Sequence, residues 1–99
     1  LIVVGTMHER KMRMAQKAEA FVALPGGWGT LDELAEILTW KQLKLVTAPV
    51  AILNTAGFYD HLLKAMQEMV ENGFLSAENL ASLLVFSNPS ELLDSLAKG

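Results

Sequence analysis

The residues best suited to chemistry lie in one short stretch, residues 25–33, which reads Pro-Gly-Gly-Trp-Gly-Thr-Leu-Asp-Glu. The apolar run 20–24 before it predicts a buried strand, and the helical spacing of Leu31, Leu34 and Leu38 after it predicts a helix. Three glycines in four positions permit positive φ and the close approach of a ligand, because no Cβ stands in the way. The first N–H groups of a helix lack intrahelical partners and favour negative charge. The stretch is therefore a candidate phosphate site.

A purely structural interpretation of the same stretch is also open. Thr30 as N-cap and Glu33 at the third helical position would form a capping box, in which the two side chains satisfy backbone amides reciprocally. The spacing matches neither the phosphate loop G-x-x-x-x-G-K-[ST] nor the dinucleotide fingerprint G-x-G-x-x-G. From the residues alone, a capped turn and a phosphate-binding loop are equally well supported.

A second group of polar residues precedes the strand predicted at 20–24. Arg10 carries a planar, permanently charged guanidinium that suits a phosphate or a ribose oxygen. Lys11 is placed to assist a phosphate, although an exposed lysine at a helix start is just as ordinary. His8 has no second histidine at ligand spacing, so we expect it to be hydrogen-bonded or solvated rather than bound to a metal.

Alternating strand and helix patterns surround these residues. Strands are predicted at 1–4, 20–24, 50–54 and 84–86, and helices at 7–18, from the glycine loop to about 45, at 58–70 and at 76–83. A last helix opens with Asn88 as N-cap, Pro89 at its first position and Glu91 at its third.

This order of elements predicts an α/β fold, a parallel sheet flanked by helices with right-handed crossovers. The carboxyl ends of parallel strands share one edge of the sheet. We therefore expect Gly5-Thr6, Pro25-Gly26 and Asn54-Thr55 to gather there, where ligands of such sheets bind.

The composition bounds the class of protein. The chain has 99 residues, so it forms one domain at most, and 52% hydrophobic against 19% charged residues is a high ratio for a small monomer. We expect apolar surface to be shared with a partner, and, since Leu1 begins in mid-strand, part of the fold to be missing. A net charge of −3 without a basic stripe argues against nucleic-acid binding. The chain has no cysteine, no long apolar run and no signal-peptide pattern, so a soluble, cytoplasmic protein is expected.

Three motifs give the chain a family resemblance. The stretch 25–33 is similar to P-G-G-x-G-T-x-x-E, the signature of the "Lonely guy" family of cytokinin riboside 5′-monophosphate phosphoribohydrolases, long labelled lysine decarboxylases. The run Met7-His8-Glu9-Arg10-Lys11 resembles the family's M-H-x-R-K motif, and the run 39–43 resembles its T-W-x-Q-L motif. The resemblance covers nearly the whole chain and is looser after residue 74.

The resemblance implies a Rossmann-like nucleotide-binding domain, of which residues 1–99 would be the C-terminal part. It implies hydrolysis of the N-glycosidic bond of AMP or an N6-modified AMP to the free base and ribose 5-phosphate, without cofactor or metal. The implied site consists of Arg10 and Glu33 as catalytic residues, Gly26, Gly27, Trp28, Gly29 and Thr30 as phosphate ligands, and Met7 and Lys11 as further substrate contacts. A homodimer through the helix 31–44, which carries Trp40, is also implied.

Other interpretations remain beside this one. The same loop could hold a nucleotide in a binding module that hydrolyses nothing. Lysine decarboxylation is rejected, because it normally uses pyridoxal phosphate on a lysine and no lysine stands in or beside the loop. Asp32 and Glu36 compete with Glu33 as the functional carboxylate, but a solvated or ion-paired role suits Glu36 better.

Overall fold

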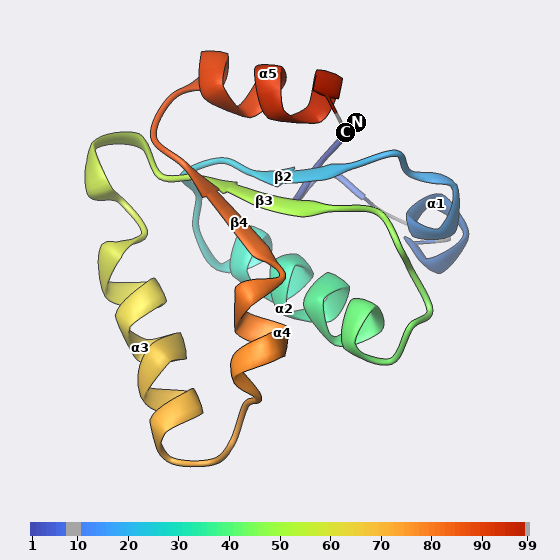
Figure 1. Ribbon diagram of the computed structural model, residues 1–99. Coiled ribbons are helices and arrows are strands. Elements are labelled where there is room, and N and C mark those ends of the chain that lie inside the picture. Colours follow the sequence, from blue (N-terminus) through green and yellow to red (C-terminus); the bar gives the residue numbers. More distant parts are fainter. Residues whose placement is uncertain (8–10, 99) are drawn as a thin grey trace.

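The computed structural model describes residues 1–7 and 11–98 (Figure 1). Its elements in chain order are β1 (Ile2–Val3), α1 (Lys11–Lys17), β2 (Phe21–Ala23), α2 (Trp28–Gln42), β3 (Val50–Leu53), a 3₁₀ turn (Thr55–Gly57), α3 (Asp60–Glu71), α4 (Ala77–Ala81), β4 (Leu83–Phe86) and α5 (Pro89–Lys98). Strands and helices alternate as the sequence predicts.

The four strands form one parallel sheet in the order β1-β2-β3-β4. Phe21 pairs with Val50 and Val50 with Leu83, so neighbouring strands run in register across the sheet. All connections are crossovers, because parallel neighbours cannot be joined by a hairpin. The predicted α/β class with a parallel sheet is confirmed.

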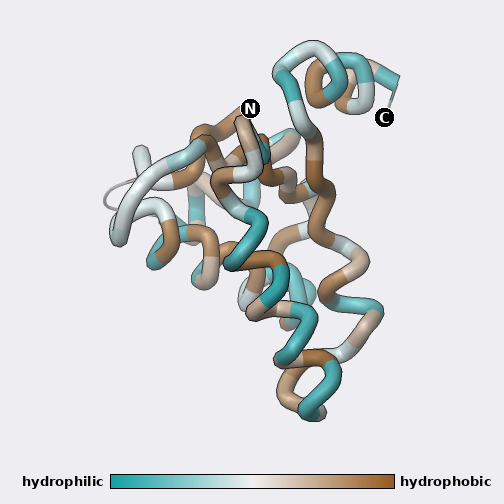
Figure 2. The backbone as a smooth tube through the Cα atoms, turned by 90° about the vertical axis from the view of Figure 1, so that its left-hand side faces the viewer, coloured by the Kyte–Doolittle hydropathy of each residue, from teal (hydrophilic) through white to brown (hydrophobic). Residues whose placement is uncertain are grey.

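Helices cover both faces of the sheet, and the alternation of side chains along β3 assigns the two faces. Val50 and Ile52 point into a core shared with α1, α2 and α3, whereas Ala51 and Leu53 point toward Leu92 of α5. In Figure 1, α5 lies above the sheet and α2 below it. Strands buried on both faces read as continuous apolar runs, and Figure 2 shows these hydrophobic stretches between the more hydrophilic turns.

The start of α5 agrees with the prediction made from the sequence, and the start of α2 differs from it. The Glu91 N–H donates to Asn88 Oδ1 at 2.9 Å, which confirms the predicted cap of α5. Helix α2, in contrast, begins at Trp28 with Gly27 as N-cap and no side-chain cap. The predicted capping box is therefore wrong: Thr30 is the third helical residue, and Glu33 is the sixth.

The remaining boundaries differ from prediction by a few residues. The helix predicted at 7–18 is described from Lys11 to Lys17, and the Thr6 hydroxyl before it donates to the Val3 carbonyl at 2.5 Å. Within the described residues, no helix combines the length and the apolar character needed to cross a bilayer.

Candidate functional site at the carboxyl edge of the sheet

The side chain of Thr30, in the first turn of α2, packs between the loop that leaves β1 and the loop that leaves β2. A Cβ placed on Gly5 would lie 3.0 Å from Thr30 Oγ1, and a Cβ on Gly26 would overlap the same oxygen. Gly5 also has φ of +97°, which other residues rarely adopt. The predicted gathering of Gly5 and Gly26 at one edge is confirmed, and both glycines are needed for the close approach.

The N-terminus of α2 presents its first amides at this edge. The Leu31 N–H is the first to bond back along the helix, to the Gly27 carbonyl at 3.1 Å. The N–H groups of Trp28, Gly29 and Thr30 therefore precede the helical hydrogen-bond ladder. The indole of Trp28 is 87% exposed. This end of α2 has the donors and the dipole that an anionic group requires.

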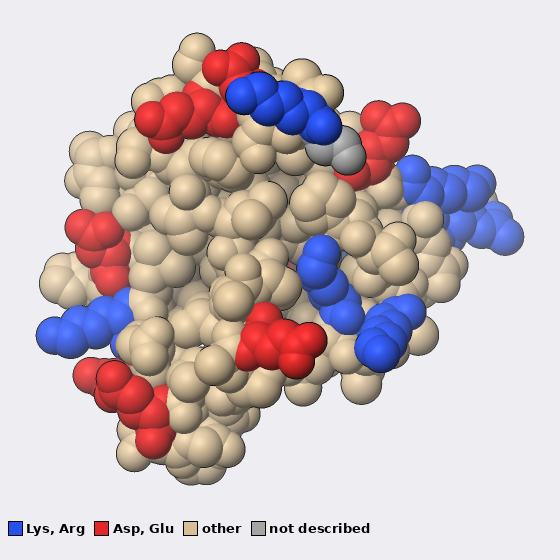
Figure 3. Space-filling view, viewed as in Figure 1, with Lys and Arg blue, Asp and Glu red and all other residues tan. Residues whose placement is uncertain are grey.

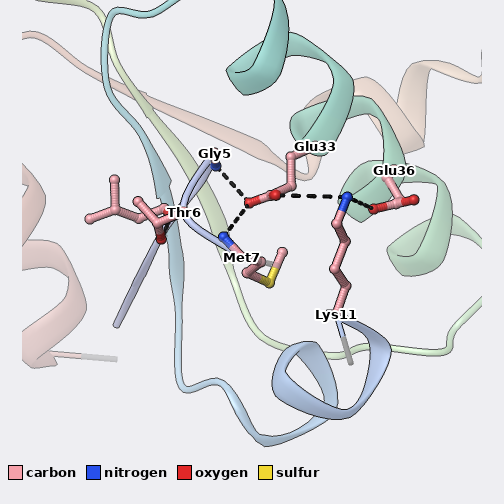
Figure 4. A network of polar contacts seen from close by, with 7 residues as sticks. Gly5, Thr6, Met7, Lys11, Glu33 and Glu36 are labelled. Carbon is pink, nitrogen blue, oxygen red and sulfur yellow. Dashed lines mark hydrogen bonds and ion pairs between the residues drawn. The ribbon is translucent and has the colours of Figure 1, made fainter. Parts of the chain in front are cut away.

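Glu33 is the buried charged residue of the site, with only 3% of its surface exposed. Its Oε1 accepts hydrogen bonds from the N–H of Gly5 at 2.6 Å and of Met7 at 3.2 Å (Figure 4). The carboxylate thus ties the loop after β1 to α2, a contact across 28 and 26 residues of chain. The bonds hold one oxygen and fix the orientation of the other.

The second oxygen of Glu33 faces the Lys11 ammonium. The same ammonium also lies beside the carboxylate of Glu36. Lys11 Nζ lies 4.0 Å from Glu33 Oε2 and 3.5 Å from Glu36 Oε1. Figure 4 shows Lys11 reaching from α1 toward both acidic side chains of α2. The structure therefore places Lys11 beside the candidate catalytic carboxylate, while Asp32 is exposed on the same helix.

Two further predicted site residues have different outcomes. The Met7 side chain is buried in the hydrophobic core, so that its contact with the site is the N–H bonded to Glu33. Arg10 lies among residues 8–10, outside the described part of the chain, as does His8.

Sequence reasoning missed Tyr59, a residue of the turn after β3 that connects to this edge. The Tyr59 hydroxyl donates to the carbonyl of Leu24, directly before the glycine loop, at 2.5 Å. The Tyr59 N–H in turn donates to Asn54 Oδ1 at 2.7 Å. Burial raises the pKa of Tyr59 above its ordinary value, which keeps the hydroxyl protonated as a donor. No sequence pattern signals these contacts, because Tyr59 and Leu24 are 35 residues apart.

Over residues 1–7 and 11–98, no three His, Asp or Glu side chains gather as metal ligands would. On the face drawn in Figure 3, acidic and basic side chains stand in small groups around a wide uncharged area.

The sequence as a whole matches one family. The family model described as "Possible lysine decarboxylase" matches residues 1–96. That span includes every element of the site and all four strands.

Curated proteins of two plants are similar over nearly the whole chain. The Arabidopsis thaliana protein named cytokinin riboside 5′-monophosphate phosphoribohydrolase LOG2 is 46% identical over 97% of this chain and 45% of its own length. A second Arabidopsis thaliana protein of that name, LOG7, is 44% identical over 94% of this chain and 43% of its own. The Oryza sativa subsp. japonica protein named probable cytokinin riboside 5′-monophosphate phosphoribohydrolase LOG4 is 46% identical over 97% of this chain and 42% of its own length. The chain thus spans less than half the length of these relatives.

Proposed function

We propose, on the premise that this chain belongs to the possible lysine decarboxylase family, that its protein hydrolyses the N-glycosidic bond of a nucleoside 5′-monophosphate. The relatives described above are named for that reaction on cytokinin riboside 5′-monophosphates. The observation that carries the proposal is the carboxylate of Glu33, buried and fixed by two amides beside the N-terminus of α2. AMP or an N6-modified AMP is the proposed substrate, and the cytoplasm is the proposed compartment, because a charged nucleotide does not cross membranes.

The substrate phosphate is assigned to the start of α2. The amides of Trp28, Gly29 and Thr30 precede the helical ladder and can donate to phosphate oxygens. Gly26 and Gly27 leave the approach free of side chains. Arg10 is the proposed partner for a phosphate or ribose oxygen, on the strength of its motif and its forked guanidinium.

The carboxylate of Glu33 is assigned to act at C1′ of the ribose, the carbon at which the reaction takes place. Glu33 lies one turn beyond Thr30, about 4.5 Å further along the helix axis. As the bond from C1′ to the base breaks, its electron pair leaves with the base, which takes up a proton, and positive charge develops on the ribose. Glu33 Oε2, which Oε1 and its two amide bonds hold in place, stabilises that charge and orients the water that adds to C1′. The added water releases one proton, which balances the proton taken up by the base.

The older description of the family as a decarboxylase is not what this site supports. Residues 25–33 contain no lysine, and the Lys11 ammonium is occupied by Glu33 and Glu36. A lysine that carries pyridoxal phosphate needs a free amine to form its Schiff base. We therefore expect no release of carbon dioxide from lysine.

Product analysis tests the proposed reaction. Full-length protein incubated with AMP should release adenine and ribose 5-phosphate in equal amounts, as measured by chromatography. Saturable binding of AMP without any release of adenine would mean that the protein is a nucleotide-binding module. Release of adenosine and inorganic phosphate would identify a phosphatase instead.

The phosphate of the substrate is expected to contribute strongly to the rate. We expect kcat/KM for adenosine to be at least roughly a hundredfold below that for AMP, since two charge-assisted hydrogen bonds of about 1.5 kcal/mol each correspond to that factor. Ribose 5-phosphate should inhibit in competition with AMP. Equal turnover of AMP and adenosine would show that the start of α2 is only a turn.

A homodimer through α2 is also proposed, supported by an uncovered apolar groove along that helix. The groove has a volume of about 350 Å³ and is lined by α2, α3 and α4. Its apolar lining includes Leu31, Ala35, Leu38, Leu62, Met66 and Leu80. Trp40, expected at this interface, is half-buried and packs against its own core. The docking surface is therefore assigned to the groove rather than to Trp40.

Substitution of Ala35, which is exposed in the groove, tests the dimer. Ala35→Glu should raise the dissociation constant of the dimer at least tenfold, about 1.4 kcal/mol, because a carboxylate would be buried against apolar side chains. Ala65→Glu, on an exposed position of α3 outside the groove, is the matched control and should leave assembly unchanged. Sedimentation velocity measures both. A monomeric wild type at tens of micromolar, or equal effects of the two variants, would contradict the assignment.

A further inference from the structure

The turn between β3 and α3 is held by the side chain of Asn54. Asn54 Oδ1 accepts from the Tyr59 N–H at 2.7 Å, and Asn54 Nδ2 donates to Asp60 Oδ1 at 2.8 Å. The backbone N–H of Asn54 donates to the Phe86 carbonyl of β4 at 2.7 Å. The turn is thus attached to the sheet at one end and closed on itself at the other.

The backbone of this turn has a conformation that few sequences adopt. Ala56 has φ of +52° and Gly57 has φ of +73°. A Cβ on Gly57 would lie 2.5 Å from Asp60 Oδ2, so any other residue would have to displace that carboxylate as well as adopt a positive φ. A non-glycine residue at positive φ persists only when its surroundings determine it. The bond from the Tyr59 N–H to Asn54 therefore specifies where Tyr59, at the end of this turn, is placed.

Tyr59 carries that placement across to the neighbouring strand. Its side chain is 2% exposed, and the ring of Phe58 packs edge-on against it with centroids 4.9 Å apart. Its hydroxyl donates to the carbonyl of Leu24, the residue that separates β2 from Pro25. Pro25 fixes φ and offers no N–H of its own. The orientation of the Leu24 peptide consequently decides how the chain enters Gly26 and Gly27.

We propose that Tyr59 is a positioning residue for the glycine loop: together with Asn54 it forms a brace that sets the direction of the amides at the start of α2. The brace acts through the Leu24 carbonyl and does not touch the substrate. Its effect on substrate binding rests on the proposed function, because those amides are the assigned phosphate donors. The effect of the brace on the geometry of the loop is independent of the proposed function.

Tyr59→Phe, studied in the full-length protein, tests the brace, since it keeps the ring and removes only the hydroxyl. Asn72→Ala is the matched control, because Asn72 Nδ2 donates to the Glu68 carbonyl at 2.8 Å, at the far end of α3 and outside the groove. Backbone NMR relaxation reports order at Gly26, Gly27, Trp28 and Gly29, and titration with ribose 5-phosphate gives the dissociation constant at the same amides. Steady-state kinetics with AMP supply kcat and KM.

In Tyr59→Phe, we expect the order parameters of these four amides to fall from about 0.85, the value of a rigid backbone, toward those of a mobile loop. The dissociation constant for ribose 5-phosphate and the KM for AMP should rise roughly threefold to tenfold, the usual loss for one hydrogen bond. The kcat at saturating AMP should change by less than about twofold, because the phosphate is held equally in the bound substrate and in the transition state. Asn72→Ala should change none of these quantities.

Unchanged order parameters in Tyr59→Phe would overturn the brace, as would mobile amides that still bind ribose 5-phosphate with wild-type affinity. If Tyr59→Phe does not fold, Asp60→Ala replaces it: loss of the bond to Asn54 should loosen the same amides to a smaller degree, and rigid amides would overturn the brace. A wild type that binds ribose 5-phosphate but releases no adenine from AMP contradicts the proposed function alone. The relaxation and titration data then still decide the brace.

Discussion

Substitution of Glu33 by glutamine is expected to lower kcat for AMP hydrolysis by about 10²–10³, because it removes the charge assigned to the oxocarbenium-like transition state. The loss should appear in kcat rather than KM, since the interaction strengthens only as the bond to the base breaks. Glutamine keeps an oxygen that can accept from Gly5 and Met7. We therefore expect the free energy of unfolding to change by less than about 1 kcal/mol.

Glu36→Gln is the matched control for this prediction. Glu36 lies three residues on, pairs with the same Lys11, and is more exposed. Its substitution should change kcat by less than about threefold, because a partly exposed ion pair is worth under ~1 kcal/mol. Melting temperature and kcat are measured on the same preparations. If Glu33→Gln retains its melting temperature and more than a tenth of the wild-type kcat, Glu33 is only an anchor for the loop after β1.

The second large effect is expected from Gly26→Ala. A methyl group there would overlap Thr30 Oγ1, so that the glycine loop and α2 must move apart. Such overpacking typically costs about 1–3 kcal/mol, and each 1 kcal/mol lowers Tm by roughly 2–4 °C in a domain of 150–250 residues. The affinity for ribose 5-phosphate should fall as well, because the donors of α2 would be displaced.

Two further variants separate packing from backbone effects. Gly29→Ala adds a methyl that meets nothing within 4 Å, in a helix where alanine is favoured by up to ~1 kcal/mol, so its stability should be retained or raised. Thr30→Ala combined with Gly26→Ala removes the overlapping hydroxyl and should recover part of the lost stability. Thermal unfolding measures all three. Equal melting temperatures for Gly26→Ala and Gly29→Ala would contradict the close packing of the two loops.

The sequence predicted the framework of the site because that framework is local. Apolar runs such as 20–24 specify strands, helical spacing specifies α2, and the parallel arrangement follows from their alternation. From the parallel arrangement alone, Gly5 and Gly26 could be placed at one edge. The cap of α5 was predictable for the same reason, since Asn88 and Glu91 are three residues apart.

What the sequence did not predict depends on contacts between distant segments. Thr30 and Glu33 have the spacing of a capping box, but in the fold Thr30 packs between Gly5 and Gly26, and Glu33 binds the amides of Gly5 and Met7. The helix begins three residues earlier because Gly27 serves as N-cap without a side chain. The bond from Tyr59 to Leu24 joins two different crossovers, and no local spacing encodes it.

A crystal structure of full-length Glu33→Gln with AMP would test the central claim most directly, because the slowed variant should retain its substrate. We predict that the phosphate binds the amides of Trp28, Gly29 and Thr30, with ribose C1′ facing residue 33 and its bond to the base intact. A phosphate bound elsewhere on the protein, or a C1′ directed away from residue 33, would contradict the assignment of the N-glycosidic reaction to this edge of the sheet.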